Sequence, residues 1–180
     1  MALVVFLRGV NVGGHRIFRP SVLTQQLRAF DVVNVGAAGT FVVRAKVSQA
    51  RLRAELARRM PFDTHVMICT GRDLLRLAAS SPFAGEPSGP NLVPFVSVLA
   101  KARQPSSPLP HRFPATGGWE LKVLGQQGRF VLGVYRRTMK AVSHLGRIDK
   151  LYGAPVTTRN WNTIMAIARL LAPPRAASGP

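Results

Sequence analysis

Short apolar runs alternate with amphipathic stretches through the first 70 residues, and this alternation limits the fold more than any other feature. Two of the stretches predict helices with apolar residues at spacings of three and four, one beginning near Pro20 and one following a capping Ser48. Four runs have the length and composition of buried strands: Ala2 to Leu7, Val32 to Val35, Thr40 to Arg44 and His65 to Cys69. The resulting order, βαββαβ, predicts a ferredoxin-like lobe in which two helices cover one face of an antiparallel sheet.

The chain beyond residue 70 predicts a second lobe. A helix begins after a capping Thr70, and the stretch SPFAGEPSGPN then breaks regular structure because it concentrates Pro, Gly and Ser. The expected fold class is α+β, with two ferredoxin-like αβ plait lobes in one chain. The expected divisions are an N-terminal lobe at 1–80, a linker at 81–91, a C-terminal α+β lobe at 92–171 and a disordered tail at 172–180.

The C-terminal lobe carries its own strand and helix signals. Pro94 marks an edge or a bulge near the start of the first strand, and a Pro-rich surface loop follows at 104–118. A threonine caps the last helix, which we expect to start at Thr157 or Thr158. The other expected elements are a strand at 92–100, a hairpin at 119–124 and 129–135 around the turn GQQG, and a helix between 138 and 152.

The chain is strongly cationic, with 25 Lys and Arg against 7 Asp and Glu and a formal net charge of +18. A field of this strength attracts polyanions such as nucleic acid, acidic proteins, phosphorylated metabolites or anionic lipid head groups. The alternative is compositional bias, which accounts for the excess of Arg over Lys but not for the scarcity of carboxylates. We therefore expect a polyanion partner, with nucleic acid as the first candidate.

Few residues suggest catalysis or a special compartment. The single cysteine, Cys69, excludes an internal disulfide and fits a reducing compartment, and the apolar opening ends at Arg8, too early for a signal sequence or a membrane span. We expect a cytoplasmic protein without a membrane partner. The carboxylates and histidines are scattered, so the sequence predicts no metal site, no cofactor and no set of nucleophile, base and orienting group. A binding function is favoured over an enzymatic one.

The stretch RGVNVGGHR follows the first predicted strand and precedes a helix. Backbone N–H groups at Gly13 and Gly14, with the side chains of Arg8, Asn11 and His15, can bind an anion in such a loop. The stretch lacks the GK[ST] and GxGxxG signatures of nucleotide-binding loops. The alternative is a structural turn in which the paired glycines adopt positive φ.

The stretch TTRNWNT lies at the expected start of the last helix. Its side chains Arg159, Asn160 and Asn162 can bind a phosphate or a backbone carbonyl. The alternative is a capped helix in which Trp161 anchors the core while Arg159 and Asn160 face water.

The stretch VYRRTMK places Arg136, Arg137 and Lys140 just past a strand, and this compact basic patch predicts a nucleic-acid surface. The alternative is a solvated charged face. Aromatic residues for base stacking are sparse, and GTFVVRA offers only Phe41 where an RNA-recognition sheet carries several.

The motifs LRGVNVGG, Leu7 to Gly14, and PVTTRNWNT, Pro155 to Thr163, resemble the two ends of a bacterial family known as domain of unknown function 1697. Its members typically read LRGINVGG near the start and TTRNWNT near the end. The resemblance runs from about Ala2 to Leu171, and it implies two αβ plaits in one chain but no reaction. Where the family usually reads QSGN, this chain reads AAGT, so only Gly39 matches and the Ser and Asn side chains are missing.

These observations favour a non-enzymatic protein whose cationic surface binds nucleic acid or another polyanion. One alternative is an enzyme or sensor for a small phosphorylated or nucleotide ligand held between LRGVNVGG and TTRNWNT. A second alternative makes both motifs structural, joining the lobes. If the motifs meet in space, they form one cleft lined by Asn11, Gly13, Gly14, Arg159, Asn160 and Asn162.

Overall fold

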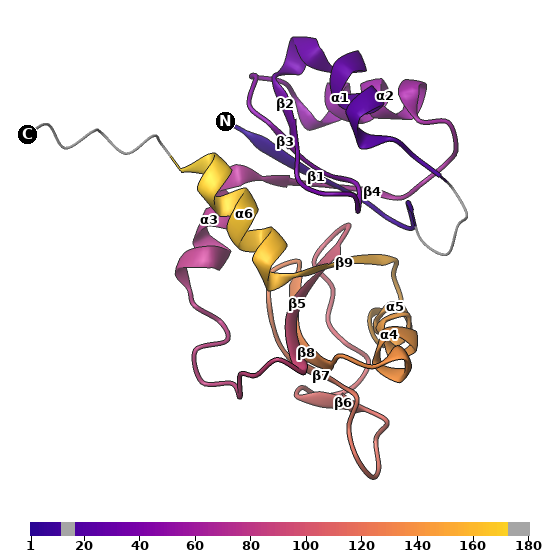
Figure 1. Cartoon of the computed structure of the whole chain (residues 1–180), viewed down its shortest axis with the longest axis vertical. Helices are drawn as coiled ribbons and strands as arrows, with labels where there is room; N and C mark the ends of the chain where they lie inside the picture. Colours follow the sequence, from indigo (N-terminus) through magenta and orange to yellow (C-terminus); the bar gives the residue numbers. More distant parts are fainter. Residues whose placement is uncertain (12–16, 173–180) are drawn as a thin grey trace, which may run out of the picture.

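The computed structural model describes residues 1–11 and 17–172, and its N-terminal half is a four-stranded antiparallel sheet (Figure 1). The elements are β1 (Leu3–Leu7), α1 (Pro20–Gln26), a short 3-10 helix (Arg28–Phe30), β2 (Val32–Asn34), β3 (Thr40–Val43), α2 (Gln49–Arg59) and β4 (Val66–Thr70). The strands lie in the order β2-β3-β1-β4, and Val5 of β1 is opposite Phe41 of β3 and Ile68 of β4. The predicted order of elements, βαββαβ, is confirmed.

Strand β1 is buried on both faces, which explains its uninterrupted apolar sequence. Successive side chains point to opposite faces of a sheet. Val5 and Leu7 pack in a core with residues of α1 and α2, whereas Val4 and Phe6 pack in a core that includes the C-terminal half. The first sheet therefore lies between its own helices and the second half of the chain.

The C-terminal half forms a second antiparallel sheet with the strand order β6-β7-β8-β5-β9. Its elements are α3 (Gly71–Ala79), β5 (Leu92–Leu99), β6 (His111–Phe113), β7 (Leu121–Gln127), β8 (Phe130–Arg136), α4 (Met139–Leu145), α5 (Arg147–Tyr152), β9 (Val156–Asn160) and α6 (Trp161–Leu171). Without β6, the order β7-β8-β5-β9 repeats the order of the first sheet, with β5 in the place of β1. Where the first half has α1, the second has the segment that carries β6.

The two halves share a buried core. Phe6 of the first sheet and Val96 of the second belong to one apolar cluster, together with Leu77 of α3 and Ile164 of α6. In Figure 1 these two helices lie side by side on one side of the molecule, at the level where the two sheets meet. A separate core under α4 and α5 includes Phe95. The halves are therefore packed together along their sheets and do not depend on the linker for contact.

The start of the last helix differs from the prediction. Thr157 and Thr158, expected to cap the helix, lie in β9, which pairs with β5. Branching at Cβ favours the strand, and the hydroxyls of Thr158 and Ser97 lie 2.6 Å apart across the two strands. Asn160 ends the strand and caps α6, because its Oδ1 accepts the N–H of Thr163 at 2.9 Å.

The Pro-rich segment 104–118 also differs from the prediction, because it contains the edge strand β6. Three residues are too few to show a periodic pattern in the sequence. Pro94 lies where expected, since it is opposite Val134 of β8 while the pairing of β5 with β9 begins only at Phe95. At Pro94 the strand is therefore an edge, where no ladder hydrogen bond is lost.

The expected linker, 81–91, contains turns but no helix or strand. Helix α3, which precedes it, packs against α6 at the end of the chain, and a Cβ at Gly71 would lie only 2.9 Å from Leu171 Cδ2. Of the expected tail, residues 173–180 lie outside the described residues.

Candidate functional site

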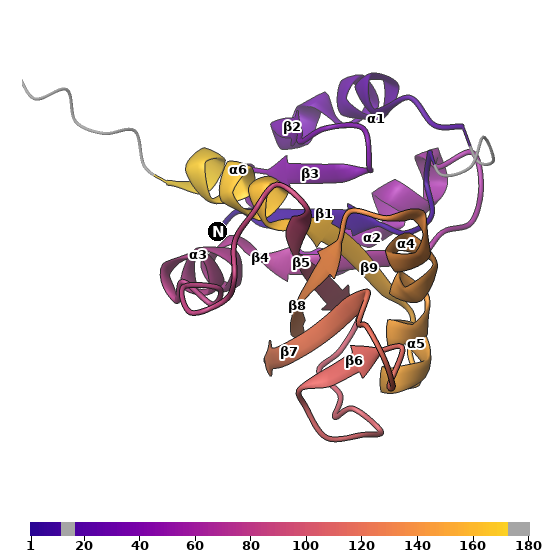
Figure 2. The ribbon, with the colours of Figure 1, turned by 60° about the horizontal axis from the view of Figure 1, so that its bottom comes forward.

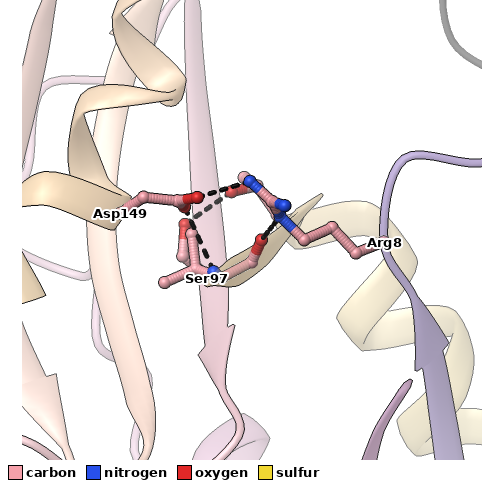
Figure 3. Close-up of polar contacts among 5 residues, drawn as sticks. Arg8, Ser97 and Asp149 are labelled. Carbon is pink, nitrogen blue, oxygen red and sulfur yellow. Dashed lines mark hydrogen bonds and ion pairs between the residues drawn. The ribbon is translucent and has the colours of Figure 1, made fainter. Parts of the chain in front are cut away.

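The two end motifs meet where β1 ends and β9 begins. Arg8 Nε donates to the carbonyl of Val156 at 3.0 Å, and the Arg8 guanidinium pairs with the carboxylate of Asp149 in α5 (Figure 3). The other carboxylate oxygen of Asp149 accepts the N–H of Val156 at 3.1 Å. The Thr157 hydroxyl donates to the carbonyl of Leu7 at 3.1 Å. The motifs thus join the two halves of the molecule.

Arg159 is buried at this junction, with 7% of its surface exposed. Burial lowers the pKa of Arg159 to about 10, which leaves the guanidinium charged at neutral pH. Nε donates to Thr40 Oγ1 at 2.6 Å, and Nη1 donates to oxygens of Thr157 and Thr158. Nη2 donates to the carbonyls of Leu7 at 2.8 Å, Ala38 at 2.5 Å and Gly39 at 3.3 Å. Every nitrogen of this side chain is therefore engaged with neutral oxygens of the protein.

The turn between β2 and β3 supplies two of these carbonyls, and its geometry depends on Gly39. This glycine has a φ of +69°, and a Cβ there would lie 2.6 Å from Val10 Cγ2 and 2.9 Å from Leu7 Cβ. The position therefore admits no side chain. This explains why the glycine is present in AAGT, whereas the neighbouring Ala38 contributes only its carbonyl to Arg159.

We expect Gly39→Ala to lower the free energy of unfolding by about 2–4 kcal/mol, because positive φ and overpacking each cost about 1–3 kcal/mol. Urea denaturation followed by circular dichroism measures the change. Gly36→Ala is the matched control, since Gly36 has a φ of +78° but no atom within 4 Å of its Cβ position. Equal losses for the two variants would show that the close approach to Val10 and Leu7 contributes nothing.

Asn11 organises the loop after β1. Its Nδ2 donates to the carbonyl of Ala37 at 2.9 Å, and its Oδ1 accepts the N–H of Phe18 at 2.8 Å. Asn11 adopts a positive φ of 55°, a conformation that asparagine tolerates better than most residues. The side chain thus ties the two ends of the loop to the β2–β3 turn. Gly13, Gly14 and His15, the other expected binding residues of this loop, lie outside the described residues.

The second half of TTRNWNT faces away from Arg8. Asn160 caps α6 through its side-chain oxygen, and Asn162 is exposed with no side-chain hydrogen bond inside the described chain. Trp161 is half-buried against Phe83, with ring centroids 5.1 Å apart and an interplanar angle of 73°. The structure therefore brings Arg8 and Arg159 to the junction but separates them from Asn162.

A third arginine joins the halves at another point. Arg129, in the turn between β7 and β8, donates from Nε to the carbonyl of Leu99 at 2.7 Å and from Nη1 to the carbonyl of Ile68 in β4 at 2.7 Å. The sequence assigned no role to this residue, because one arginine in a turn resembles any surface arginine. Arg8, Arg129 and Arg159 together are the arginine clamp of this fold.

A family model described as a protein of unknown function (DUF1697) matches residues 1–109. The chain belongs to this family. The match covers the β1 loop and the β2–β3 turn and ends before TTRNWNT. The comparison with curated proteins gives no match. The solved structure of the conserved bacterial protein SP0830 from Streptococcus pneumoniae is similar to this chain with a TM-score of 0.61 and 17% sequence identity, covering 95% of this chain and 98% of that chain. The similarity shows a shared fold across both halves.

Two cations lie over the ring of Trp119 in this DUF1697 chain. Lys122 Nζ lies 4.3 Å from the ring centroid and Arg136 Cζ lies 4.6 Å from it. Arg136 Nε also donates to the carbonyl of Trp119 at 2.9 Å. Arg112 of β6 is opposite Lys122 of β7. These residues and the two neighbouring cations form the tryptophan patch: Arg112, Trp119, Lys122, Arg136, Arg137 and Lys140.

Half of this patch was expected from the sequence. Arg136, Arg137 and Lys140 are exposed, as a surface for polyanions requires. The sequence predicts a hairpin strand at Trp119 and indicates no role for Lys122 or for Arg112. Their proximity depends on the pairing of β6 with β7 and of β7 with β8, which no local pattern reveals.

The patch is not neutralised by the protein. Within the described residues, the ion pairs are Arg8 with Asp149 and Glu55 with Arg58 and Arg59. The nearest carboxylate in sequence, Glu120, accepts the hydroxyl of Thr138 at 2.7 Å. The cations around the aromatic ring therefore form no ion pair within the described residues and outnumber Glu120, the one carboxylate that neighbours the ring in sequence.

Groups with catalytic potential are few in the part of the chain that the structure describes. No three of its His, Cys, Asp and Glu side chains are grouped to hold a metal ion. Burial raises the pKa of the Cys69 thiol to about 12, so this cysteine is a neutral thiol at physiological pH and packs in the shared core. None of the described helices is both long and apolar enough to cross a membrane.

Proposed function

We propose that this protein binds nucleic acid through the tryptophan patch, without catalysing a reaction. The observation that carries the proposal is an indole ring held among cations that have no carboxylate partner in the described structure. Arginine and lysine side chains bind phosphates, and an indole offers a flat surface on which a base can stack.

Strand register supports one continuous binding face. Lys122 is opposite Val134 in the β7–β8 pair, and Arg136 lies two residues beyond Val134 on the same strand. Side chains two residues apart on a strand share a face, so Lys122 and Arg136 project together, with Arg112 beside Lys122. Arg137 and Lys140 extend the charge toward α4. Arg112, Lys122 and Arg136 thus share one face of the β6–β7–β8 sheet, on which a nucleic-acid backbone can lie.

We infer a structural role for the two end motifs. Arg159 gives its donors to Leu7, Ala38, Gly39 and Thr40, and Arg8 gives its donors to Val156 and Asp149. These contacts engage every nitrogen of Arg159 and two nitrogens of Arg8 without a ligand, which favours the alternative in which the motifs join the lobes. The same contacts give less support to the alternative of a small-ligand cleft between the motifs, because they already engage the donors that such a ligand would need.

We also infer that the two halves are αβ plaits, of which the second has lost its first helix. The order β7-β8-β5-β9 matches β2-β3-β1-β4, and α4 with α5 occupies the chain position of α2. A cytoplasmic location is part of the proposal, supported by the single buried cysteine, which suits a reducing compartment.

Binding of labelled single-stranded and duplex oligonucleotides across a salt series tests the proposed function. We expect micromolar or tighter dissociation constants at about 0.15 M salt. The logarithm of the association constant should fall linearly with the logarithm of salt concentration, by about 0.7 per contacted phosphate for single strands and about 0.9 for duplex. Loss of all binding at physiological salt would show that the charge is compositional background.

A further inference from the structure

A cationic cavity lies on the face of the edge strand β6 that is opposite the tryptophan patch. Its volume is about 370 Å³, and Leu151 contributes to its lining together with polar and aromatic residues. His111 and Phe113 alternate with Arg112 along β6, so they face away from the tryptophan patch and toward α5. Figure 2 shows β6 beside α5. The other lining residues are Ser106, Ser107, Arg147 and Lys150.

The positive charge of this cavity is uncompensated. Arg147 and Lys150 are three residues apart on α5 and therefore lie on one face of that helix. Neither forms an ion pair with a carboxylate of the described residues. Asp149 lies between them in sequence, but its carboxylate is engaged by Arg8 and by the N–H of Val156. The lining holds no carboxylate, so an anion that enters meets attraction from two cations and polar contact from two serines.

An aromatic wall stands beside the cations. The rings of His111 and Phe113 have centroids 4.7 Å apart at 61°, and the ring of His144 is stacked on Phe113 with centroids 6.2 Å apart at 18°. Arg147 Cζ lies 6.0 Å from the Phe113 centroid. Neighbouring rings hold Phe113 in place, so the wall is formed before a ligand arrives.

We propose that this cavity binds a small phosphate ester that carries a flat ring, of the mononucleotide class. Arg147 and Lys150 bind the phosphate, with the guanidinium supplying paired donors and the ammonium a point charge. The ring lies along His111 and Phe113. The volume of about 370 Å³ falls within the usual range for small-ligand sites, about 300–1,000 Å³. The lining of this cavity includes no residue of the tryptophan patch. If the patch does not bind nucleic acid, the proposal for this cavity is unaffected.

Isothermal titration calorimetry of the full chain tests the proposal with four probes: adenosine monophosphate, adenosine, ribose 5-phosphate and inorganic phosphate. We expect the mononucleotide to bind with one-to-one stoichiometry and at least about tenfold more tightly than each of the three fragments, because only it engages both the cations and the aromatic wall. Failure of the mononucleotide to bind, or binding no tighter than inorganic phosphate, would overturn the proposal.

Two variants locate the bound nucleotide. Arg147→Ala and Lys150→Ala should each weaken mononucleotide binding about tenfold, whereas Lys101→Ala, which removes an exposed charge outside the lining, should leave it unchanged. Trp119→Ala should also leave it unchanged. If Trp119→Ala abolishes mononucleotide binding and Arg147→Ala does not, the nucleotide binds at the tryptophan patch and this cavity is not its site. If oligonucleotides bind and the mononucleotide does not, this inference fails while the proposed function stands.

Discussion

Arg159→Met should lower the free energy of unfolding by about 3–5 kcal/mol, the largest loss expected for a single substitution in the end motifs, because it removes several hydrogen bonds from a charged donor. Methionine keeps much of the buried volume but supplies no donor to the carbonyls of Leu7, Ala38 and Gly39. A hydrogen bond from a charged donor contributes about 1.5–3 kcal/mol, and all those of Arg159 are lost at once. The carbonyls of Leu7 and Gly39 keep the Thr157 hydroxyl and the Leu7 N–H, whereas the Ala38 carbonyl loses the Arg159 donor. Native domains are stable by only about 5–15 kcal/mol, so the variant should be close to unfolding. Urea denaturation measures the loss.

Two further variants test whether the loss of stability comes from the hydrogen-bond geometry of Arg159, from its charge, or from any change in the TTRNWNT motif. Arg159→Lys keeps the charge, but a single ammonium cannot reach Thr40 and the β2–β3 turn together, so most of the loss should remain. Asn162→Ala changes the same motif at an exposed position and should alter stability by no more than about 0.5 kcal/mol. If the Arg159→Met protein is as stable as the unmodified protein but no longer binds a ligand, the structural role is refuted and Arg159 is a binding residue.

The N-terminal half was predictable because its signals are local. Strand β1 is buried on both faces and reads as a continuous apolar run, and α2 carries Leu52 and Leu56 on one face after the capping Ser48. The residues within each element are enough to predict whether it is a helix or a strand. The order βαββαβ is the sequence of these local predictions along the chain. The strand order then places β1 at the centre of the sheet.

The C-terminal half was less predictable because its signals depend on distant partners. Thr157 and Thr158 are good caps in isolation, and only the free edge of β5 makes them a strand. Arg159 was expected to bind an anion or, in the alternative, to face water, yet it is buried against a turn that lies about 120 residues earlier in the chain. Asn160, the true cap, lies two residues beyond Thr158, the later of the two expected caps. The two motifs indicated which residues lie at the junction but not which groups those residues contact.

The proposed structural role of the end motifs implies that a recognisable motif need not be a ligand site. A buried arginine that bonds two lobes requires carbonyls at hydrogen-bond distance, as Arg159 has at Leu7 and Ala38. Gly39 illustrates the same point, because the close approach of Val10 and Leu7 excludes every side chain there. The tryptophan patch carries no comparable motif, and its residues come from three strands, a helix and the segments between them.

Trp119→Ala should weaken the binding of single-stranded oligonucleotides about 5-fold to 150-fold, because stacking on an aromatic side chain contributes about 1–3 kcal/mol per base. Duplex binding should change less, since paired bases are stacked on each other and leave the indole only backbone and sugar to contact. Fluorescence anisotropy with labelled oligonucleotides of both kinds measures the difference. Trp119 is half-buried, so unchanged thermal unfolding of the variant must accompany the result.

Substitution of the two cations over the Trp119 ring should change the salt dependence of oligonucleotide binding. Lys122→Ala and Arg136→Ala should each reduce the slope of log affinity against log salt by about 1, since each removes one phosphate contact. Lys46→Ala removes the same charge from an exposed position in the N-terminal half and should leave the slope unchanged. Equal slopes for all three variants would mean that the whole cationic surface binds without a defined site. If the slope falls only for Lys122→Ala and Arg136→Ala, and Trp119→Ala weakens single-strand binding more than duplex binding, the nucleic acid binds on the β6–β7–β8 face.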